Sequence, residues 1–254
     1  MTLDLFGGPA MLFLPANRER AVVKARGSAA DLVVLDLEDA VKAEDKDAAR
    51  EAVRAAVSSS WRMPVGVRVN AGSQDDMAIA LESSCDFIVV PKVEVPLEKH
   101  GKPLLAMIEN AAGVLNLEAI ASSVAGLIVG TNDLAMSLKL PRIERPSMGF
   151  ALQSCVLTAR AVGIAVFDGV FNRLDDPEGL ARECADSRAL GFDGKSLIHP
   201  DQIAPCQAAF APTEEEIERA QRLVAAASGG AERFEGAMIE DLHVAAAQHL
   251  LARA

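Results

Sequence analysis

Eight short apolar runs recur along the chain, and amphipathic stretches of helical length separate most of them. The runs cover residues 11–14, 32–37, 65–69, 87–90, 104–108, 124–129, 164–167 and 192–198, and polar residues interrupt the last of them. The amphipathic stretches include residues 18–26, 45–58, 75–83, 113–122 and 177–190. Strand-length runs that alternate with helices predict parallel strands joined by right-handed crossovers.

A closed barrel fits this alternation better than an open sheet. Eight repeats within about 200 residues are typical of an α/β protein of the (β/α)₈, or TIM, barrel type. The rival, an open doubly wound sheet, predicts a G-x-G-x-x-G turn after an early strand, and the sequence contains none. We therefore expect a barrel domain over residues 1–212. Residues 213–254 should form a C-terminal extension with helices at 213–226 and 241–253, either part of the same domain or an oligomer lid.

Composition narrows the class of protein. Aromatic residues make up 4% of the chain and Tyr is absent, so Ala, Val, Leu and Ile must build the core, as suits buried parallel strands. The net charge of −11 argues against binding to nucleic acid or to anionic membranes. The four cysteines lack metal-ligand spacing, and no apolar run approaches the length of a membrane span. We expect a soluble, cytoplasmic protein.

Polar and charged residues follow nearly every apolar run. In a barrel of this type the chemistry takes place at the carboxyl ends of the strands, so these residues should meet at one mouth. They are Asp36, Glu38 and Asp39, then Arg68 and Asn70, Lys92 and Glu94, Glu109 and Asn110, Asn132 and Asp133, Asp168, and finally Lys195 and His199.

Two of these acids, Glu109 and Asp133, end adjacent strands and suit a hard divalent cation. Mg²⁺ prefers a few carboxylates and leaves its other positions to water and substrate oxygens. A cation held in this way can bind an α-keto or α-hydroxy acid and stabilise an enolate, and Arg68 could bind the same oxygen. The alternative is that each charged residue caps a helix or pairs with a neighbour; the complete ring favours a site.

Other chemistries find weaker support. Lys92 and Lys195 could form Schiff bases, although pairing with nearby carboxylates is the favoured interpretation. His199 could orient a ligand or make a structural hydrogen bond, and the other histidines lack metal-ligand spacing. No serine lies in a nucleophile-elbow motif, which argues against a Ser-His-Asp hydrolase.

An ordered series of motifs resembles the citrate lyase β-subunit-like branch of the HpcH/HpaI aldolase superfamily. The motifs are LFLPANR at 12–18, LDLEDAV at 35–41, VRVN at 67–70, VPKVE at 90–94, MIENAAGV at 107–114, GTNDL at 130–134, FDGV at 167–170 and GFDGKSLIHP at 191–200. The resemblance spans about residues 10 to 245. It implies a (β/α)₈ barrel, usually a homotrimer or hexamer, that acts on short hydroxy-dicarboxylic acyl-CoA thioesters such as citryl-, malyl- or citramalyl-CoA.

The resemblance also implies roles for individual residues. Glu109 and Asp133 would bind Mg²⁺, and Arg68 would stabilise the enolate or the keto acid. Glu38 and Asp39 would support the metal waters and the keto-acid fragment. Residues 17–24 would lie near the coenzyme A side, and Arg18, Lys92 and Asn132 join Arg68 as the expected substrate-binding residues.

The sequence departs from the family pattern in three places. The usual Pro-Gly of the first loop is Pro15-Ala16, which loses a flexible glycine. Asn132 stands where many relatives carry a small residue. Relatives often end the tail motif with a catalytic Asp that reaches a neighbouring subunit, whereas here Glu240 follows Ile239. Glu240 either keeps the catalytic role with altered geometry or has lost it.

The leading hypothesis is therefore a Mg²⁺-dependent carbon–carbon lyase that works through an enolate. The alternatives are a malyl-CoA-type thioesterase, an aldolase that acts on free keto acids without CoA, and a non-catalytic binding subunit. The sequence does not identify the general base.

Overall fold

The computed structural model describes residues 3–252, which divide into two compact units at the boundary between Ala209 and Phe210. The first unit holds all eight strands of a closed barrel, and the second is a small helical unit. Among the described residues, no helix is both long and apolar enough to cross a membrane.

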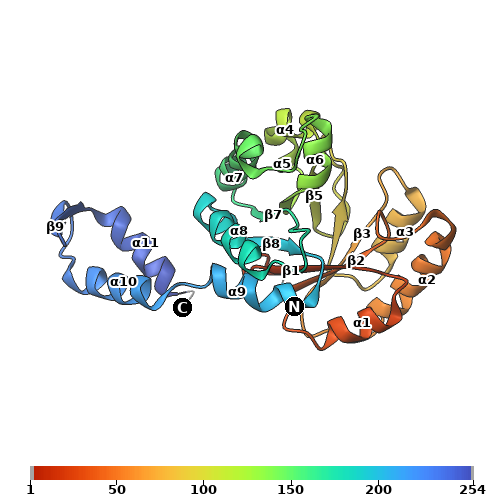
Figure 1. Cartoon of the computed structure of the whole chain (residues 1–254), viewed down its shortest axis with the longest axis horizontal. Helices are drawn as coiled ribbons and strands as arrows, with labels where there is room; N and C mark the ends of the chain where they lie inside the picture. The colour runs from red at the N-terminus through yellow and green to blue at the C-terminus, as the bar shows by residue number, and fades with distance from the viewer. Residues whose placement is uncertain (1–2, 253–254) are drawn as a thin grey trace. The chain divides into compact units, whose positions relative to one another are not determined.

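The barrel of the first unit confirms the expected (β/α)₈ fold. All eight strands are parallel and pair in sequence order, and β1 closes the ring against β8 (Figure 1). The strands are β1 (Ala10–Pro15), β2 (Leu32–Asp36), β3 (Val65–Arg68), β4 (Phe87–Val90), β5 (Leu104–Ile108), β6 (Gly126–Val129), β7 (Ala165–Asp168) and β8 (Gly194–Leu197). Each expected run contains one of these strands or overlaps it to within three residues at its ends.

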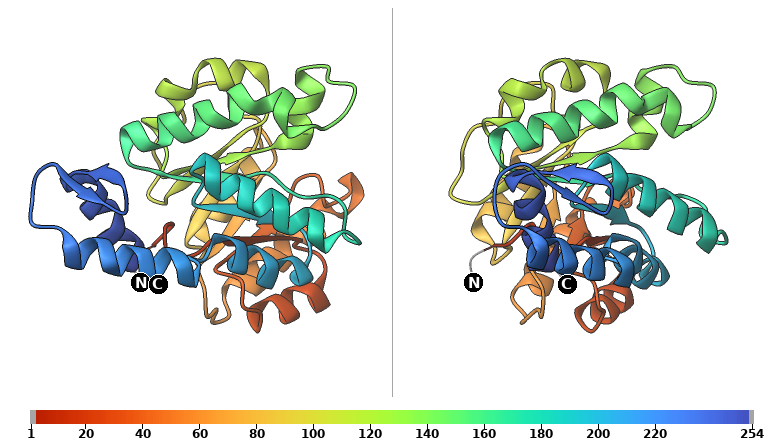
Figure 2. Two further views of the ribbon diagram at one scale, coloured as in Figure 1. Left: turned by 60° about the vertical axis from the view of Figure 1, so that its left-hand side comes forward. Right: turned by 90° about the vertical axis from the view of Figure 1, so that its left-hand side faces the viewer.

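Helices cover the barrel on its outside (Figure 2). They are α1 (Glu19–Arg26), α2 (Lys46–Val57), α3 (Gln74–Glu82), α4 (Ala111–Leu115), α5 (Leu117–Ala121), α6 (Thr131–Ser137), α7 (Gly149–Val162), α8 (Pro177–Leu190) and α9 (Ile203–Phe210), with 3₁₀ turns η1 (Ala43–Asp45), η2 (Arg145–Met148) and η3 (Pro200–Gln202). The expected helix at 113–122 is two short helices instead, because the backbone leaves helical geometry at Asn116. Helices α6, α7 and α9 were not expected.

Apolar side chains fill the inside of the barrel. The central cluster includes Met11, Phe87, Leu105, Ile128 and Phe167, all fully buried. Gly66 of β3 makes room for this packing, since a Cβ atom there would overlap the ring of Phe87. Three of the chain's few aromatic residues, Phe13, Phe87 and Phe167, thus lie in this central cluster.

The second unit is a helical hairpin with a small ribbon. Helices α10 (Glu214–Ala226) and α11 (Asp241–Leu251) lie side by side, and strands β9 (Glu232–Phe234) and β10 (Ala237–Ile239) pair antiparallel between them in sequence (Figure 1). Thr213 caps α10, accepting from the Glu216 N–H while the Glu216 carboxylate accepts the Thr213 N–H. Helix α11 ends at Leu251; the expected helix end at Arg253 lies outside the described residues.

Candidate active site

The carboxyl ends of the strands surround a cavity of about 310 Å³. Its polar wall contains the side chains that the sequence singled out most strongly, which come from the loop after β2, from β3, from the position after β5 and from α6. These are Asp39, Arg68, Glu109, Asn132 and Asp133, joined by Thr131, Asn172 and Ser196. The cavity therefore brings together residues that are far apart in the chain.

Glu109 follows β5 directly and is almost fully buried. One carboxylate oxygen, Oε1, accepts a hydrogen bond of 2.6 Å from the backbone N–H of Lys92. The other, Oε2, occupies space that exists only because residue 130 is glycine, since a Cβ atom there would overlap it. Burial first, and then the nearby carboxylates of Glu38 and Asp133, raise the pKa of Glu109 to about 7 against the opposing effects of Lys92 and Arg68.

Asp133 lies in the first turn of α6, close enough to Glu109 to raise the pKa of that carboxyl. Residues 3–252 contain no group of three or more His, Cys, Asp or Glu side chains arranged to hold a metal. Two carboxylates beside an open cavity are nevertheless the donor set that Mg²⁺ accepts, because Mg²⁺ takes its remaining ligands from water and substrate. A divalent cation here would also offset the repulsion between the two acids.

Arg68, at the end of β3, is held in place by two acids from the second strand region. Its Nε and Nη2 donate to the two oxygens of Asp36 at 2.7 and 2.5 Å, and its Nη1 lies 2.9 Å from Glu38 Oε2. Burial alone would lower the pKa of the guanidinium, but these carboxylates raise it above its usual value. Arg68 is thus a permanently charged, fixed donor on the cavity wall.

Lys92 connects two of the acids and carries backbone strain. Its φ of 54° lies in the left-handed region, where a residue with a side chain is disfavoured. Its N–H donates to Glu109, its Nζ donates to Glu38 Oε1 at 2.8 Å, and Asp39 Oδ1 is 4.0 Å from Nζ. Burial raises the pKa of Glu38, while the hydrogen bond from Lys92 opposes that rise. Lys92 is therefore paired with carboxylates, which was the interpretation favoured over a Schiff-base lysine.

The strand ends do not all face the cavity, so that part of the expectation was wrong. Asp168 and Lys195 point outward into the helical layer, where Lys195 Nζ lies 2.9 Å from Asp168 Oδ2 and 2.7 Å from Glu183 Oε1. Arg145 and Ser187 contact the same Asp168 oxygen. The reason is the alternation of side chains along a strand, since a shift of one residue reverses the face.

Three other expected residues take different positions. His199 caps η3, its Nδ1 accepting the Asp201 N–H at 3.2 Å, which is the structural alternative. Arg18 is the exposed residue that precedes α1 and lies outside the set that lines the cavity. Glu240 precedes α11 in the second unit, and its N–H donates to His243 Nδ1 at 2.9 Å.

Asn132 lies on the cavity wall with an unexpected partner, Asn172. Each amide donates to the other, with distances of 2.7 and 3.3 Å. The sequence analysis missed Asn172, which lies four residues beyond β7, and it also missed Ser196 and Thr131 as lining residues. The one available signal was proximity to a strand end.

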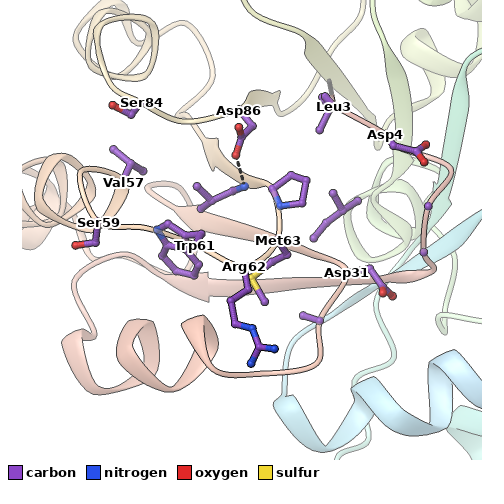
Figure 3. Close-up of a pocket in the computed structure, with 16 residues that line it drawn as sticks. Leu3, Asp4, Asp31, Val57, Ser59, Trp61, Arg62, Met63, Ser84 and Asp86 are labelled. Atoms are coloured by element: carbon purple, nitrogen blue, oxygen red, sulfur yellow. Dashed lines mark hydrogen bonds between the residues drawn. The ribbon is translucent and has the colours of Figure 1, made fainter. Parts of the chain in front are cut away.

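A larger cavity, of about 650 Å³, lies at the amino ends of β2 and β3 (Figure 3). Its carboxylates are engaged by the backbone: Asp86 Oδ2 accepts the Val65 N–H at 2.7 Å, and Asp31 Oδ2 accepts the Ala10 N–H at 2.9 Å. In barrels of this type that end serves stability and the carboxyl end serves chemistry. The smaller cavity is therefore the candidate active site.

The sequence profile of the HpcH/HpaI aldolase/citrate lyase family matches the chain over residues 9–100 and 97–200. The chain belongs to this family. Membership in the HpcH/HpaI aldolase/citrate lyase family confirms the resemblance drawn from the motifs. It also confirms the expectation of an enzyme at the level of the family.

Relatives within the family carry two kinds of name. The (3S)-malyl-CoA thioesterase of Cereibacter sphaeroides is 38% identical over 266 residues, covering 96% of this chain and 93% of that protein. The citrate lyase subunit beta-like protein of Deinococcus radiodurans is 36% identical, with 95% of each chain covered. At similar identity, the relatives thus include a thioesterase and a citrate lyase subunit beta-like protein.

A solved structure of the family supports the cofactor expectation. It is protein CitE from Mycobacterium tuberculosis in complex with magnesium, acetoacetate and coenzyme A. Its sequence is 32% identical, its TM-score is 0.89, and the alignment covers 98% of both chains. Magnesium is thus present in a relative whose fold matches this one.

Proposed function

We propose that this protein is a Mg²⁺-dependent carbon–carbon lyase that cleaves or condenses a short hydroxy-dicarboxylyl-CoA, such as citryl-, malyl- or citramalyl-CoA. One observation carries the proposal: Glu109, Asp133 and the fixed guanidinium of Arg68 line the same cavity. Two acids can hold a hard cation there, and a permanent positive charge faces the same space. The magnesium and coenzyme A in the solved relative support the cofactor and the substrate class.

Each group has a defined part in this proposal. Bound Mg²⁺ would supply the charge that holds the carboxylate and hydroxyl of the acid and offsets negative charge on its oxygen. Glu109 and Asp133 would hold the ion, and Glu38 and Asp39 would orient its water ligands. Arg68 would compensate the charge on the acid as its hydroxyl becomes a carbonyl. Lys92, Asn132 and Arg18 are proposed to bind the substrate.

The bond changes balance as follows. A base takes the hydroxyl proton, the carbon–carbon bond breaks, and its electron pair remains on the acyl-CoA fragment as a thioester enolate. A proton then adds to the enolate carbon. Glu240 is our candidate for the base, on the strength of its place in the tail motif.

The test uses (3S)-malyl-CoA with Mg²⁺ or with EDTA. Cleavage by a lyase gives acetyl-CoA and glyoxylate, should cease in EDTA and should return with Mg²⁺. Glu109→Gln keeps the size but removes the charge, and we expect kcat to fall at least about 100-fold. Glu118→Gln, on an exposed position of α5, is the matched control and should be unchanged. Turnover that survives EDTA would defeat the proposal.

A second candidate function is hydrolysis of the thioester, which the name of the Cereibacter sphaeroides relative favours. The same incubation separates the two reactions, since a thioesterase releases free coenzyme A and intact malate. Activity on free keto acids without CoA would indicate an aldolase. Absence of any turnover, with ligand binding retained, would indicate a binding subunit.

From the family resemblance and the net negative charge, we propose a homotrimer or hexamer in the cytoplasm that binds neither nucleic acid nor membranes. Light scattering of the purified protein measures the assembly directly, and a monomeric mass would contradict it.

A further inference from the structure

Ser196 of β8 has a buried hydroxyl that the mechanism above does not use. The residue is 3% exposed and lines the mouth cavity. Across residues 3–252 no hydrogen-bond partner exists for its Oγ. Ser196 is the only residue that both lines this cavity and carries such a buried, unpartnered atom within that range.

The orientation of Ser196 follows from its neighbours on the strand. Lys195 projects outward to Asp168 and Glu183 in the helical layer. Because side chains alternate along a strand, Ser196 must project inward, where it lines the cavity beside Phe13 and Ile198. In register it lies opposite Met11, within the buried part of the barrel.

An unpartnered hydroxyl in this position is costly. A buried donor without a partner loses its hydrogen bonds to water and gains none in return. Alanine would fill the same position without that penalty, and apolar side chains fill the rest of the barrel interior. The cost is removed if a bound ligand supplies the missing partner.

The cavity defines the chemistry of that ligand. Arg68 ends β3, Glu109 follows β5 and Asp133 lies in α6, whereas Ser196 comes from β8. Apolar side chains, among them Val170 and Ile198, also line the cavity. A small acid held at the carboxylates and the guanidinium would therefore find one hydroxyl donor from a separate strand.

We propose that Ser196 is a specificity residue that donates a hydrogen bond to an oxygen of the short oxo or hydroxy acid in the cavity. This inference rests on the proposed function, since it assumes that such an acid binds with Mg²⁺ at Glu109 and Asp133. It applies equally to a lyase and to a thioesterase, because both must bind the acid fragment.

The experiment measures binding of pyruvate, a short oxo acid, by calorimetry in the presence of Mg²⁺. Ser196→Ala should weaken pyruvate binding by about 10- to 100-fold, the usual range for losing a hydrogen bond to a charged oxygen. The Ser196→Ala variant should keep the Mg²⁺ affinity of the parent protein. Its melting temperature should equal that of the parent or exceed it. Cysteine is a weaker donor of similar size, so the pyruvate affinity of Ser196→Cys should lie between those of the parent protein and Ser196→Ala.

Ser187→Ala is the matched control, since the Ser187 hydroxyl is also buried but donates to Asp168 in the helical layer at 2.5 Å. It should lower the melting temperature and leave pyruvate affinity unchanged, the reverse of the pattern for Ser196→Ala. Pyruvate affinity in Ser196→Ala within twofold of the parent would overturn the assignment. If the parent protein binds neither Mg²⁺ nor pyruvate, the proposed function fails first and this inference fails with it.

Discussion

At the scale of single residues, Gly130 determines whether Glu109 can reach the cavity. A Cβ atom at position 130 would overlap both the Cβ and Oε2 of Glu109. Gly130→Ala should therefore displace the carboxylate that we assign to Mg²⁺. We expect Mg²⁺ affinity, measured by calorimetry, to fall by at least about tenfold, in line with the geometric demands of this ion.

The control for this change is Gly149→Ala at the start of α7, where an added Cβ meets nothing within 4 Å. Alanine is favoured over glycine in helices, so this variant should keep its Mg²⁺ affinity and gain some stability. Equal Mg²⁺ affinity in both variants would mean that Gly130 does not shape the metal site.

At the scale of the elements, the sequence predicted strands better than helices. The barrel strands are buried on both faces, so each reads as an unbroken apolar run, as β5 does over Leu104–Ile108. Helix α7 was missed because apolar residues lie on its exposed side as well, including Phe150 and Leu157, which blurs the helical period.

The sequence also predicted the candidate site only in part. Position after a strand identified Glu109, Asp133 and Arg68 as candidates, because strand ends converge in any such barrel. It could not tell which face a residue takes, so Asp168 and Lys195 were grouped with them. Ser196 was passed over because a serine within a strand carries no pattern that distinguishes it.

The buried network that joins β7, β8 and α8 makes the fold sensitive to acid. Burial alone would raise the pKa of Asp168, but Lys195, Arg145 and Ser187 together lower it below its usual value. A carboxyl with a lowered folded pKa contributes stability above its unfolded pKa of about 4, and that stability is lost as pH falls through the folded value. The free energy of unfolding should therefore decrease in acid below about pH 4.

Asp168→Asn removes this contribution. This variant leaves Lys195 and Arg145 buried beside a neutral side chain. We therefore expect its unfolding free energy to be about 3–5 kcal/mol lower at neutral pH and to depend less on pH in acid. Urea unfolding between acid and neutral pH measures both effects. Asp175→Asn, at an exposed position before α8, is the control and should follow the parent curve. If the unfolding free energy of Asp168→Asn fell in acid as steeply as that of the parent protein, other carboxyls would be the cause of the acid sensitivity.

At the scale of the whole molecule, the proposed metal site couples stability to pH and to Mg²⁺. Burial raises the pKa of Glu109 to about 7, so in the metal-free protein the proton is bound more tightly folded than unfolded. The tighter proton binding stabilises the folded state. This stabilisation is complete below the unfolded pKa of about 4.3 and is lost as pH rises through about 7. Glu109 therefore makes the metal-free barrel less stable in mild alkali.

Bound Mg²⁺ should reverse this trend, because the ion requires the ionised carboxylate and stabilises the folded state in proportion to its affinity. We expect Mg²⁺ affinity to rise up to about tenfold per pH unit below pH 7 and to level off above it. The increase in melting temperature caused by Mg²⁺, measured against EDTA, should thus be larger at about pH 8 than at about pH 6. Glu109→Gln cannot titrate and should show a small shift at either pH. A Mg²⁺-induced shift that is large and independent of pH in the parent protein would mean that the ion binds without displacing a proton from Glu109.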